Sequence, residues 1–461
     1  MPDQLNIILC LCDQLRAFEV GCYGNAVIRT PNMDRLAAEG VRFETAVTSY
    51  PICMAARSAL LSGQYNRRAT GGVSNINFKR HDGGFAMPQY PDPGRPHLKD
   101  PTLPELLRGA GYHTAAIGKW HIHSWPHDIG FDHYVIPRVS HCHTGQSFTE
   151  DGGIEFVPPG YSVDYEAERV ERFLQTKKGG ADPFFLYYNI SPPHCPLADA
   201  PERYRTMYRP EEIPLRPNVD LTKPIDNQDH WFKVYRWDFR YYDHHVPAAE
   251  NLPPGYALRH LIAEYYGLTT WVDDTLGRML AALEANGLDE NTIVVFASDH
   301  GDNLGSHGLV QKGSFNEESI RIPLIIRGGA GIPAGRVNRD TIASLIDLAP
   351  TLLSRAGIAS PSHFHGQDLS PFLDGSSGAP AESRAFIETP RGAAVRTPRS
   401  LCSLGYDESK RHLLPGARQF FDLENDPYQL RNLADSDGQS QCQAELEAVL
   451  LEWDRRTPWM S

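Results

Sequence analysis

The sequence predicts an α/β protein with a large doubly wound mixed sheet flanked by helices, followed by a smaller α+β subdomain that carries a short antiparallel sheet. Two observations support the main sheet. Several apolar runs are typical of strands buried on both faces, and they alternate with helical segments along the chain. A third observation is that this alternation stops near residue 376, where short strand-like segments begin to follow one another. We therefore expect a main domain over residues 1–375 and a subdomain over residues 376–461.

The first half of the main domain begins with a near-continuous apolar run at residues 6–12, which predicts a central strand. Thr30 before Pro31 starts a helix that Gly40 ends, and residues 41–47 predict the next strand. Residues 71–101 are rich in Gly, Pro, Asn and Asp, so we expect a loop there. The remaining elements of this half are a helix at 103–111, a strand at 114–117, a helix at 163–175 and a strand at 183–190.

The second half begins with residues 196–256, which contain many Pro, Tyr and Trp residues without clear periodicity. We expect a long surface excursion there, which serves either as a pocket wall or as the subunit contact of a homo-oligomer. Beyond it we expect one long helix or two at 258–286, strands at 291–297 and 322–326, and a strand followed by a helix within 341–357. The subdomain is expected to contain short strands at 384–388, 393–404 and 419–422 and a closing helix at 442–455.

Composition limits the functions open to this chain of 461 residues. Its net charge of −13 argues against nucleic acid as a partner, because phosphate binding needs a basic surface, although a local pocket can still be positive. No apolar run reaches membrane-spanning length, and no basic segment precedes the first one, so we expect neither a membrane partner nor a signal peptide. The eight cysteines are scattered singly, which favours a reducing, cytoplasmic location.

The stretch PICMAARSALLSG, from Pro51 to Gly63, predicts a turn that opens a short helix. Pro51 disfavours helix before it, good helix formers follow, and Gly63 stands where a helix would stop. Cys53 is therefore expected near a helix N-terminus, where free N–H groups and the helix dipole favour a thiolate or a bound oxyanion. Arg57, one turn later on the same face, can fork onto an anion held there. Taken alone, the same features also suit a buried structural cysteine.

Polar clusters stand at the ends of four predicted strands. They are Asp13-Gln14, Lys119-Trp120-His121, His194 and Asp299-His300. Because ligands of open α/β sheets lie beyond the carboxyl ends of the strands, these clusters and the Cys53 helix predict one shared site. Each cluster has a simpler explanation when it is considered alone, since an aspartate after a strand often caps the following helix. Their coincidence favours the shared site.

The order Cys53-x-Ala55-x-Arg57, with Ser62-Gly63 closing the helix, resembles the signature of the sulfatase family in the alkaline phosphatase superfamily. The resemblance covers nearly the whole chain and includes the stretches 21–25, 117–121, 299–302, 321–324 and 421–427. It points to the branch of arylsulfatases, choline-sulfatase-like enzymes and phosphonate monoester hydrolases, because Gln14 stands where many family members have a second aspartate. Ala55 also replaces the commoner proline of the signature.

This resemblance implies a formylglycine and a metal ion. In the family, a maturation enzyme oxidises the signature cysteine to formylglycine, whose hydrated aldehyde is the nucleophile. One divalent cation, expected to be Ca²⁺ with Mn²⁺ or Mg²⁺ as alternatives, would be held by Asp13, the modified Cys53, Asp299 and His300; carboxylate oxygens suit a hard cation and imidazole tolerates Mn²⁺. The resemblance also implies catalytic groups, namely Cys53, Arg57, Lys119, His121, His194 and Lys312, and two substrate-binding residues, Gln14 and Asn75.

The roles of these groups follow from the resemblance together with charge. Arg57 and the cation would stabilise the attacking oxygen. The sulfuryl oxygens would be bound by Lys119, His194 and Lys312, and one of the latter two would support the leaving alkoxide. His121 would help to remove the proton whose loss expels sulfate.

The leading hypothesis is hydrolysis of a small-molecule sulfate ester, aryl or alkyl, to an alcohol and sulfate. A phosphodiester or phosphonate monoester hydrolase is the nearest alternative, because sulfate monoesters and phosphodiesters are both monoanions. The Lys119-Trp120-His121 stretch favours a sulfatase, whereas Gln14 favours the alternative. Two hypotheses of other classes stay open: a hydrolase that uses unmodified Cys53 with a histidine, and a catalytically inactive anion-binding protein.

Overall fold

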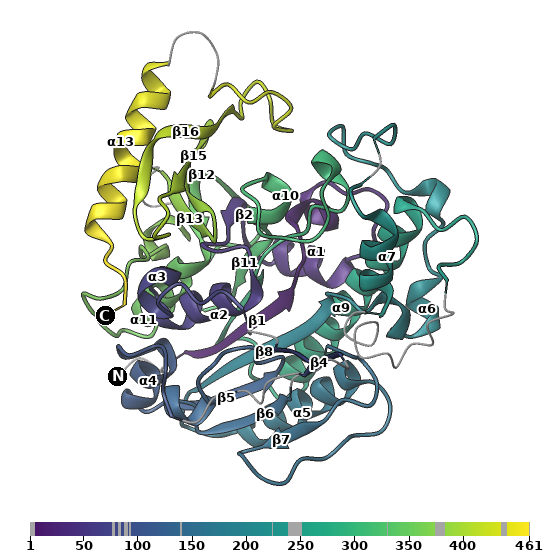
Figure 1. Ribbon diagram of the computed structural model, residues 1–461. Helices are drawn as coiled ribbons and strands as arrows, with labels where there is room; N and C mark the ends of the chain where they lie inside the picture. Colours follow the sequence, from purple (N-terminus) through teal and green to yellow (C-terminus); the bar gives the residue numbers. More distant parts are fainter. Residues whose placement is uncertain are drawn as a thin grey trace.

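The computed structural model in Figure 1 shows a large central sheet with helices on both faces and a smaller sheet beside it, near the C-terminal end of the chain. The structure describes residues 5–75, 79–81, 84–86, 91, 94–138, 141–223, 225–237, 251–329, 331–373, 383–434 and 440–460. The large mixed sheet and the separate antiparallel sheet confirm the predicted fold class.

The large sheet has ten strands in the order β10–β2–β11–β9–β1–β8–β5–β6–β7, with β12 paired to β2. Strands β9, β1, β8, β5 and β6 run parallel, whereas β11 and β7 are antiparallel to them. The carboxyl ends of the five parallel strands therefore meet at one edge. The bounds are β1 (Asn6–Asp13), β2 (Gly40–Val47), β5 (His113–Gly118), β6 (His133–Pro137), β7 (Phe148–Glu150), β8 (Phe184–Pro193), β9 (Thr292–Ser298), β10 (Arg321–Ile322), β11 (Leu324–Arg327) and β12 (Arg336–Ser344).

Strand β1 separates two hydrophobic cores, because alternate side chains of a strand point to opposite faces. Ile8 and Cys10 belong to the core that contains buried side chains of α1 (Pro31–Ala38), α5 (Ser162–Lys177) and α9 (Leu258–Ala285). Ile7 and Leu9 belong to the core that contains those of α2 (Cys53–Ser62), α4 (Leu103–Gly109) and α11 (Leu348–Arg355). Every residue of β1 is buried, which explains its continuous apolar run. Helices on both faces make the sheet doubly wound, as predicted.

Short elements connect this framework. They are the 3-10 helices η1 (Ala17–Glu19), η2 (Gly21–Tyr23), η3 (Pro126–Ile129), η4 (Leu197–Asp199), η5 (Pro210–Glu212), η6 (Ser306–Gly308) and η7 (Leu345–Asp347), and the α-helices α3 (Asn66–Ala69), α6 (Glu202–Arg205), α7 (Gln228–Trp237), α10 (Glu317–Ile320) and α12 (Ser370–Leu373).

The C-terminal sheet is antiparallel, in the order β13 (Ala385–Thr389), β14 (Gly392–Arg396), β15 (Ser400–Tyr406) and β16 (Leu413–Asp422). Helix α13 (Gln441–Arg456) packs on it through a shared apolar cluster. The single strand expected at 393–404 is wrong, because the chain turns back after β14, where the Thr397 N–H donates to the Ser400 carbonyl. The expected boundary between residues 375 and 376 lies outside the described residues, so the division into 1–375 and 376–461 stays a prediction.

In the described part of residues 196–256 many residues are exposed, as expected of a surface excursion, but several aromatic side chains of the segment are buried. Tyr204 is buried and stacks on Trp271 of α9 with 5.6 Å between ring centroids. Phe232 and Tyr235 of α7 are also buried. Aromatic side chains without a regular spacing can still cover an apolar helix face, and here they cover α9 within the same chain. Part of the segment thus packs internally, while many of its other residues are exposed.

Three smaller predictions also need correction or completion. The loop expected at 71–101 contains a hairpin of β3 (Lys79–His81) and β4 (Gly84–Ala86). The segment at 258–286 forms one helix, α9. Strands β6 and β7 were not predicted, because both are short. Among the described helices, none combines the length and the apolar character that a membrane span requires.

His365 secures the chain where α2 ends. Gly63 terminates the helix in a left-handed conformation (φ 60°), and its carbonyl accepts the backbone N–H of His365 at 2.7 Å. The His365 Nδ1 accepts the backbone N–H of Tyr65 at 3.0 Å, and the two rings stack. Burial, with the positive charge of Arg68 adding to it, lowers the pKa of His365 from 6.5 to about 4.

Acid is therefore expected to weaken this end of α2. Between pH 6.5 and pH 4 the unfolded chain binds a proton at His365 that the native protein does not bind, so the free energy of unfolding falls as the pH falls. His365→Gln, which keeps an acceptor for Tyr65, should remove about 3 kcal/mol of this decrease. Urea unfolding of both proteins at about pH 7 and about pH 4 measures the difference. An identical pH dependence in the two proteins would contradict the assignment.

Candidate active site

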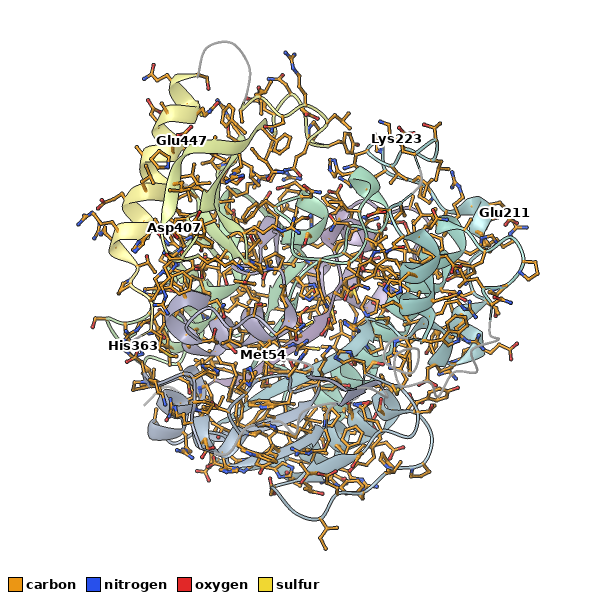
Figure 2. All side chains as sticks on the ribbon, in the orientation of Figure 1. Met54, Glu211, Lys223, His363, Asp407 and Glu447 are labelled. Carbon is orange, nitrogen blue, oxygen red and sulfur yellow. The ribbon has the colours of Figure 1, made fainter. Side chains whose placement is uncertain are left out.

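The predicted polar clusters gather at the carboxyl edge of the large sheet. Asp13 is the last residue of β1, and Asp299 directly follows β9. Strands β1 and β9 pair with Cys12 opposite Ser298, a register that places Asp13 beside Asp299. Helix α2 begins at the same edge, and Figure 2 labels its second residue, Met54, near the middle of the molecule. Segments far apart in the sequence thus meet in one site.

Four buried side chains form a cluster that suits a metal ion. Asp13, Cys53, Asp299 and His300 each offer a ligand atom, and these atoms lie within 4.8 Å of one another. The Cys53 Sγ is 3.2 Å from His300 Nε2 and 3.6 Å from Asp13 Oδ1. The other ring nitrogen of His300, Nδ1, lies 2.8 Å from the Gly301 carbonyl, a contact that orients Nε2 toward the cluster. The structure brings together the whole ligand set that the resemblance implies.

Arg57 faces the two carboxylates of this cluster. Its guanidinium donates to Asp299 Oδ2 at 3.0 Å, to Asp13 Oδ2 at 3.1 Å and to Asn189 Oδ1 at 2.6 Å. The fork that we expected to face a bound anion is therefore occupied by residues of the chain. The reason is electrostatic, since buried carboxylates need a buried partner at all times, whereas a substrate anion is present only intermittently. Asn189 was missed, and its one signal in the sequence is a polar residue within an apolar run.

Two lysines supply further positive charge. The Lys119 Nζ is 2.5 Å from Asp13 Oδ2, and the Lys312 Nζ is 3.0 Å from the Cys53 Sγ. Burial alone raises the pKa of the Cys53 thiol, but the charges of Lys312, Lys119 and His300 outweigh burial and hold this pKa well below its ordinary value. Burial also raises the pKa of Asp13, and the lysines reverse that shift as well. The site therefore favours negative charge at residue 53.

Besides His300, two predicted histidines lie beside the same thiol, with the ring of a third histidine between them. His121 and His194 both form hydrogen bonds with Cys53. Their rings flank the ring of His141, whose centroid is 5.5 Å from that of His121 and 4.4 Å from that of His194. Burial lowers the pKa of His121, and burial with the charges of Lys312 and Lys119 lowers that of His194 to about 4. Both predicted histidines are thus neutral near neutral pH.

Gln14 enters the site through its main chain and its side chain. Its φ of 67° is uncommon for a residue other than glycine, and such conformations are often found at functional sites. Its N–H donates to Asp299 Oδ1 at 3.0 Å, and its Oε1 accepts from Lys312 Nζ at 2.8 Å. The substrate-binding role expected for Asn75 stays a prediction.

Sequence reasoning missed two further partners of this network. Asp302 accepts a hydrogen bond from the Gln14 Nε2, and the Tyr235 hydroxyl lies 2.7 Å from both oxygens of Asp302. Asp302 ends the Asp-His-Gly-Asp stretch, which is a signal that was available in the sequence. Tyr235 comes from α7, in the segment without periodicity, and no pattern there pointed to it.

Comparison with known proteins places the chain in a family. The sequence profile described as sulfatase matches residues 5–358, and a profile described as N-sulphoglucosamine sulphohydrolase, C-terminal, matches residues 305–456. An N-acetylglucosamine-6-O-sulfatase of Bacteroides thetaiotaomicron is 27% identical over 506 residues, with 98% of this chain and 86% of that protein covered.

The solved structure of BT4656 in complex with its substrate, D-glucosamine-2-N,6-O-disulfate, is 26% identical with a TM-score of 0.78 and 98% of both chains covered. A phosphonate monoester hydrolase from Silicibacter pomeroyi, 21% identical with a TM-score of 0.73 over 98% of this chain and 96% of that one, shares the fold. The chain belongs to the sulfatase family.

Proposed function

We propose that this sulfatase hydrolyses organic sulfate monoesters, aryl or alkyl, to an alcohol and sulfate, using a formylglycine derived from Cys53 and one divalent cation. The observation that supports the proposal most strongly is the convergence of Asp13, Cys53, Asp299 and His300 at one buried point. The two lysines beside this point suit a monoanionic ester, because positive charge there attracts the sulfuryl oxygens.

The chemistry of the cluster fits a divalent cation. Arg57 contacts Asp13 and Asp299 through their Oδ2 atoms, and their Oδ1 atoms lie 3.8 Å and 3.6 Å from His300 Nε2. Two carboxylate oxygens and an imidazole nitrogen therefore converge on one point. Oxygen ligands suit Ca²⁺, which we expect, or Mg²⁺, and the imidazole also suits Mn²⁺. The ion would be held by Asp13, Asp299, His300 and the side chain at position 53. When bound, it would stabilise negative charge on the nucleophilic oxygen and on the ester.

Position 53 suits a formylglycine made by a maturation enzyme. Cys53 opens α2 in the Cys-x-Ala-x-Arg signature, and its Sγ lies among carboxylate oxygens. Hard cations prefer oxygen ligands to sulfur, so a hydrated aldehyde completes this ligand set better than a thiolate does. It would also supply an oxygen nucleophile in place of sulfur.

Substrate binding, support of the leaving group and proton transfer would be carried out by side chains of this protein. The ammonium groups of Lys119 and Lys312 would bind sulfuryl oxygens whose charge changes during the transfer. Although burial lowers the pKa of Lys312, the charges of the Cys53 thiolate, Asp13 and Asp299 raise it above its ordinary value, and the two carboxylates remain when residue 53 carries an aldehyde. Lys312 therefore suits the leaving alkoxide better than His194, which is neutral near neutral pH. His121 would accept the proton whose loss releases sulfate.

Hydrolysis of a phosphodiester or phosphonate monoester is the second candidate. It is favoured by Gln14, which stands in the cluster where many sulfatases have a second aspartate. A hydrolase that uses the Cys53 thiolate directly draws support from the 3.2 Å contact with His300, but it gives Asp13 and Asp299 no common task. A catalytically inactive anion-binding protein gives no task to the neutral His121.

The other expectations about partners and location stay proposals. We propose that the protein works in the cytoplasm, a location that the single scattering of the eight cysteines along the sequence favours. Its partners would be a small-molecule sulfate ester and the maturation enzyme, with neither nucleic acid nor membrane involved. Assembly into a homo-oligomer stays a prediction.

Mass spectrometry of the peptide that carries Cys53 tests the nucleophile. Protein from the native host, or from a host with a maturation enzyme, is expected to show the aldehyde form at residue 53. Cys53→Ala should lower kcat/KM for an aryl sulfate by at least about 10³-fold, because the covalent route is lost. Active enzyme with a fully unmodified thiol would instead favour direct use of the cysteine.

A side-by-side comparison of kcat/KM for an aryl sulfate, an aryl phosphodiester and an aryl phosphonate tests the substrate class. All three should share one leaving group, so that the rates report on the transferred group alone. The aryl sulfate is expected to react fastest. A preference of several orders of magnitude for a phosphorus substrate would make the second candidate correct, and no turnover by aldehyde-bearing protein would favour the inactive binding protein.

Removal of Arg57 tests whether a cation lies between the carboxylates. Arg57→Met should lower the free energy of unfolding by about 3–5 kcal/mol in EDTA, because Asp299 loses its buried guanidinium partner and Asp13 keeps only Lys119. The loss should be smaller in saturating Ca²⁺, since the ion then neutralises the same carboxylates. Urea unfolding measures both values.

The matched control is Arg209→Met, because Arg209 pairs with Glu212 at the surface. Its stability is expected to stay unchanged under both conditions. If Arg57→Met loses the same stability with and without Ca²⁺, the carboxylates do not share a calcium ion.

A further inference from the structure

The side chain of Gln14 can satisfy its neighbours in only one orientation. Its Oε1 accepts from Lys312 Nζ at 2.8 Å, whereas its Nε2 donates to Asp302 and, at 3.4 Å, to Gln311 Oε1. An ammonium group can only donate and an ionised carboxylate can only accept. Reversing the amide would therefore set two donors against each other at Lys312 and two acceptors against each other at Asp302. Gln14 is 1% exposed, so water cannot relieve the mismatch.

Asp302 is itself held firmly in place. It is fully buried, and it accepts the backbone N–H of Leu304 at 2.9 Å as well as the hydroxyl of Tyr235. Tyr235 in turn accepts the backbone N–H of Gln311 at 2.7 Å. Gln311 directly precedes Lys312 and has a φ of 62°, which is uncommon for this residue type. Helix α7 thus controls both the carboxylate that faces Gln14 and the backbone that carries Lys312.

We propose that Asp302 and Tyr235 are positioning residues that hold the Gln14 amide with its oxygen toward Lys312, and so keep the Lys312 ammonium beside residue 53. This inference rests on the proposed function, in which the Lys312 ammonium binds the sulfate ester. Neither Asp302 nor Tyr235 needs to touch the substrate. Both residues act through the chain of hydrogen bonds that runs from Asp302 through the Gln14 amide to Lys312 Nζ.

A purely structural role for Asp302 makes a different prediction about neighbouring substitutions. If Asp302 merely fills space or anchors Leu304, changes at positions 14 and 302 should act independently. If Asp302 orients the amide, the effect of a change at one position depends on whether the other position offers a donor or an acceptor. Residues in direct contact that act together show such coupling in a double-mutant cycle.

The cycle uses Gln14→Glu, Asp302→Asn and the double variant. Gln14→Glu places two carboxylates face to face, and Asp302→Asn sets the NH₂ group of the new amide against that of Gln14. The double variant restores the match, because the new amide at position 302 would donate to the new carboxylate at position 14, which still accepts from Lys312. We expect Gln14→Glu to lower kcat/KM for an aryl sulfate, and the added Asp302→Asn to recover about tenfold. The free energy of unfolding in EDTA should show recovery of the same sign.

Tyr235→Phe provides a second test with a matched control. Tyr256 also donates to a carboxylate and its ring packs against Phe232 of α7, but its hydroxyl bonds to Glu264 rather than to Asp302. Both Tyr→Phe variants lose a hydroxyl–carboxylate interaction, and Tyr235→Phe should lose more stability because it also leaves the Gln311 N–H without its acceptor. Tyr235→Phe alone should lower kcat, by about tenfold, because only it frees the Gln311–Lys312 backbone.

The outcomes separate this inference from the proposed function. Additive losses in the cycle, in both activity and stability, would overturn the inference, as would equal activity of the two Tyr→Phe variants. Recovery of stability in the double variant, in a protein that turns over no aryl sulfate at all, would support the orientation of the amide and count against the sulfatase chemistry.

Discussion

The structure depends on the burial of two neighbouring carboxylates, Asp13 and Asp299, at the ends of adjacent strands. Two like charges about 4 Å apart repel by roughly 4 kcal/mol at the effective dielectric of a protein, and each also loses its hydration. The positive charges of Arg57 and Lys119 offset this repulsion, because both side chains contact the carboxylates directly. The same positive charges would also attract the anionic ester that we propose as the substrate.

The topology of the sheet explains how a small number of side chains can form the candidate active site. The functional side chains that follow a parallel strand or open α2 have their positions fixed by the hydrogen-bonded sheet and the two apolar cores. Positive φ values at Gln14, His121 and Gln311 turn the chain sharply there. Such conformations persist only where the surrounding structure holds them, which the dense packing on both faces of β1 provides.

Much of this architecture could be predicted from sequence, because it rests on local patterns. Continuous apolar runs predicted the buried strands, and the polar residues after them predicted the gathering of Asp13, Cys53, Asp299 and His300. The partners of Arg57 could not be predicted, since they depend on which strands are neighbours and in what register. Asn189 is one such partner. Tyr235 was missed for another reason, because aromatic packing on α9 follows no sequence period.

We propose that Asp13, residue 53, Asp299 and His300 share one cation. The direct test is anomalous diffraction. The protein is stripped of metal and then crystallised in the presence of Mn²⁺, which serves as the probe. We expect one strong anomalous peak within ligand distance of all four side chains. The absence of a peak at this position would contradict the proposal. A Mn²⁺ peak at another position, with Asp13 and Asp299 still in contact with Arg57, would contradict it as well.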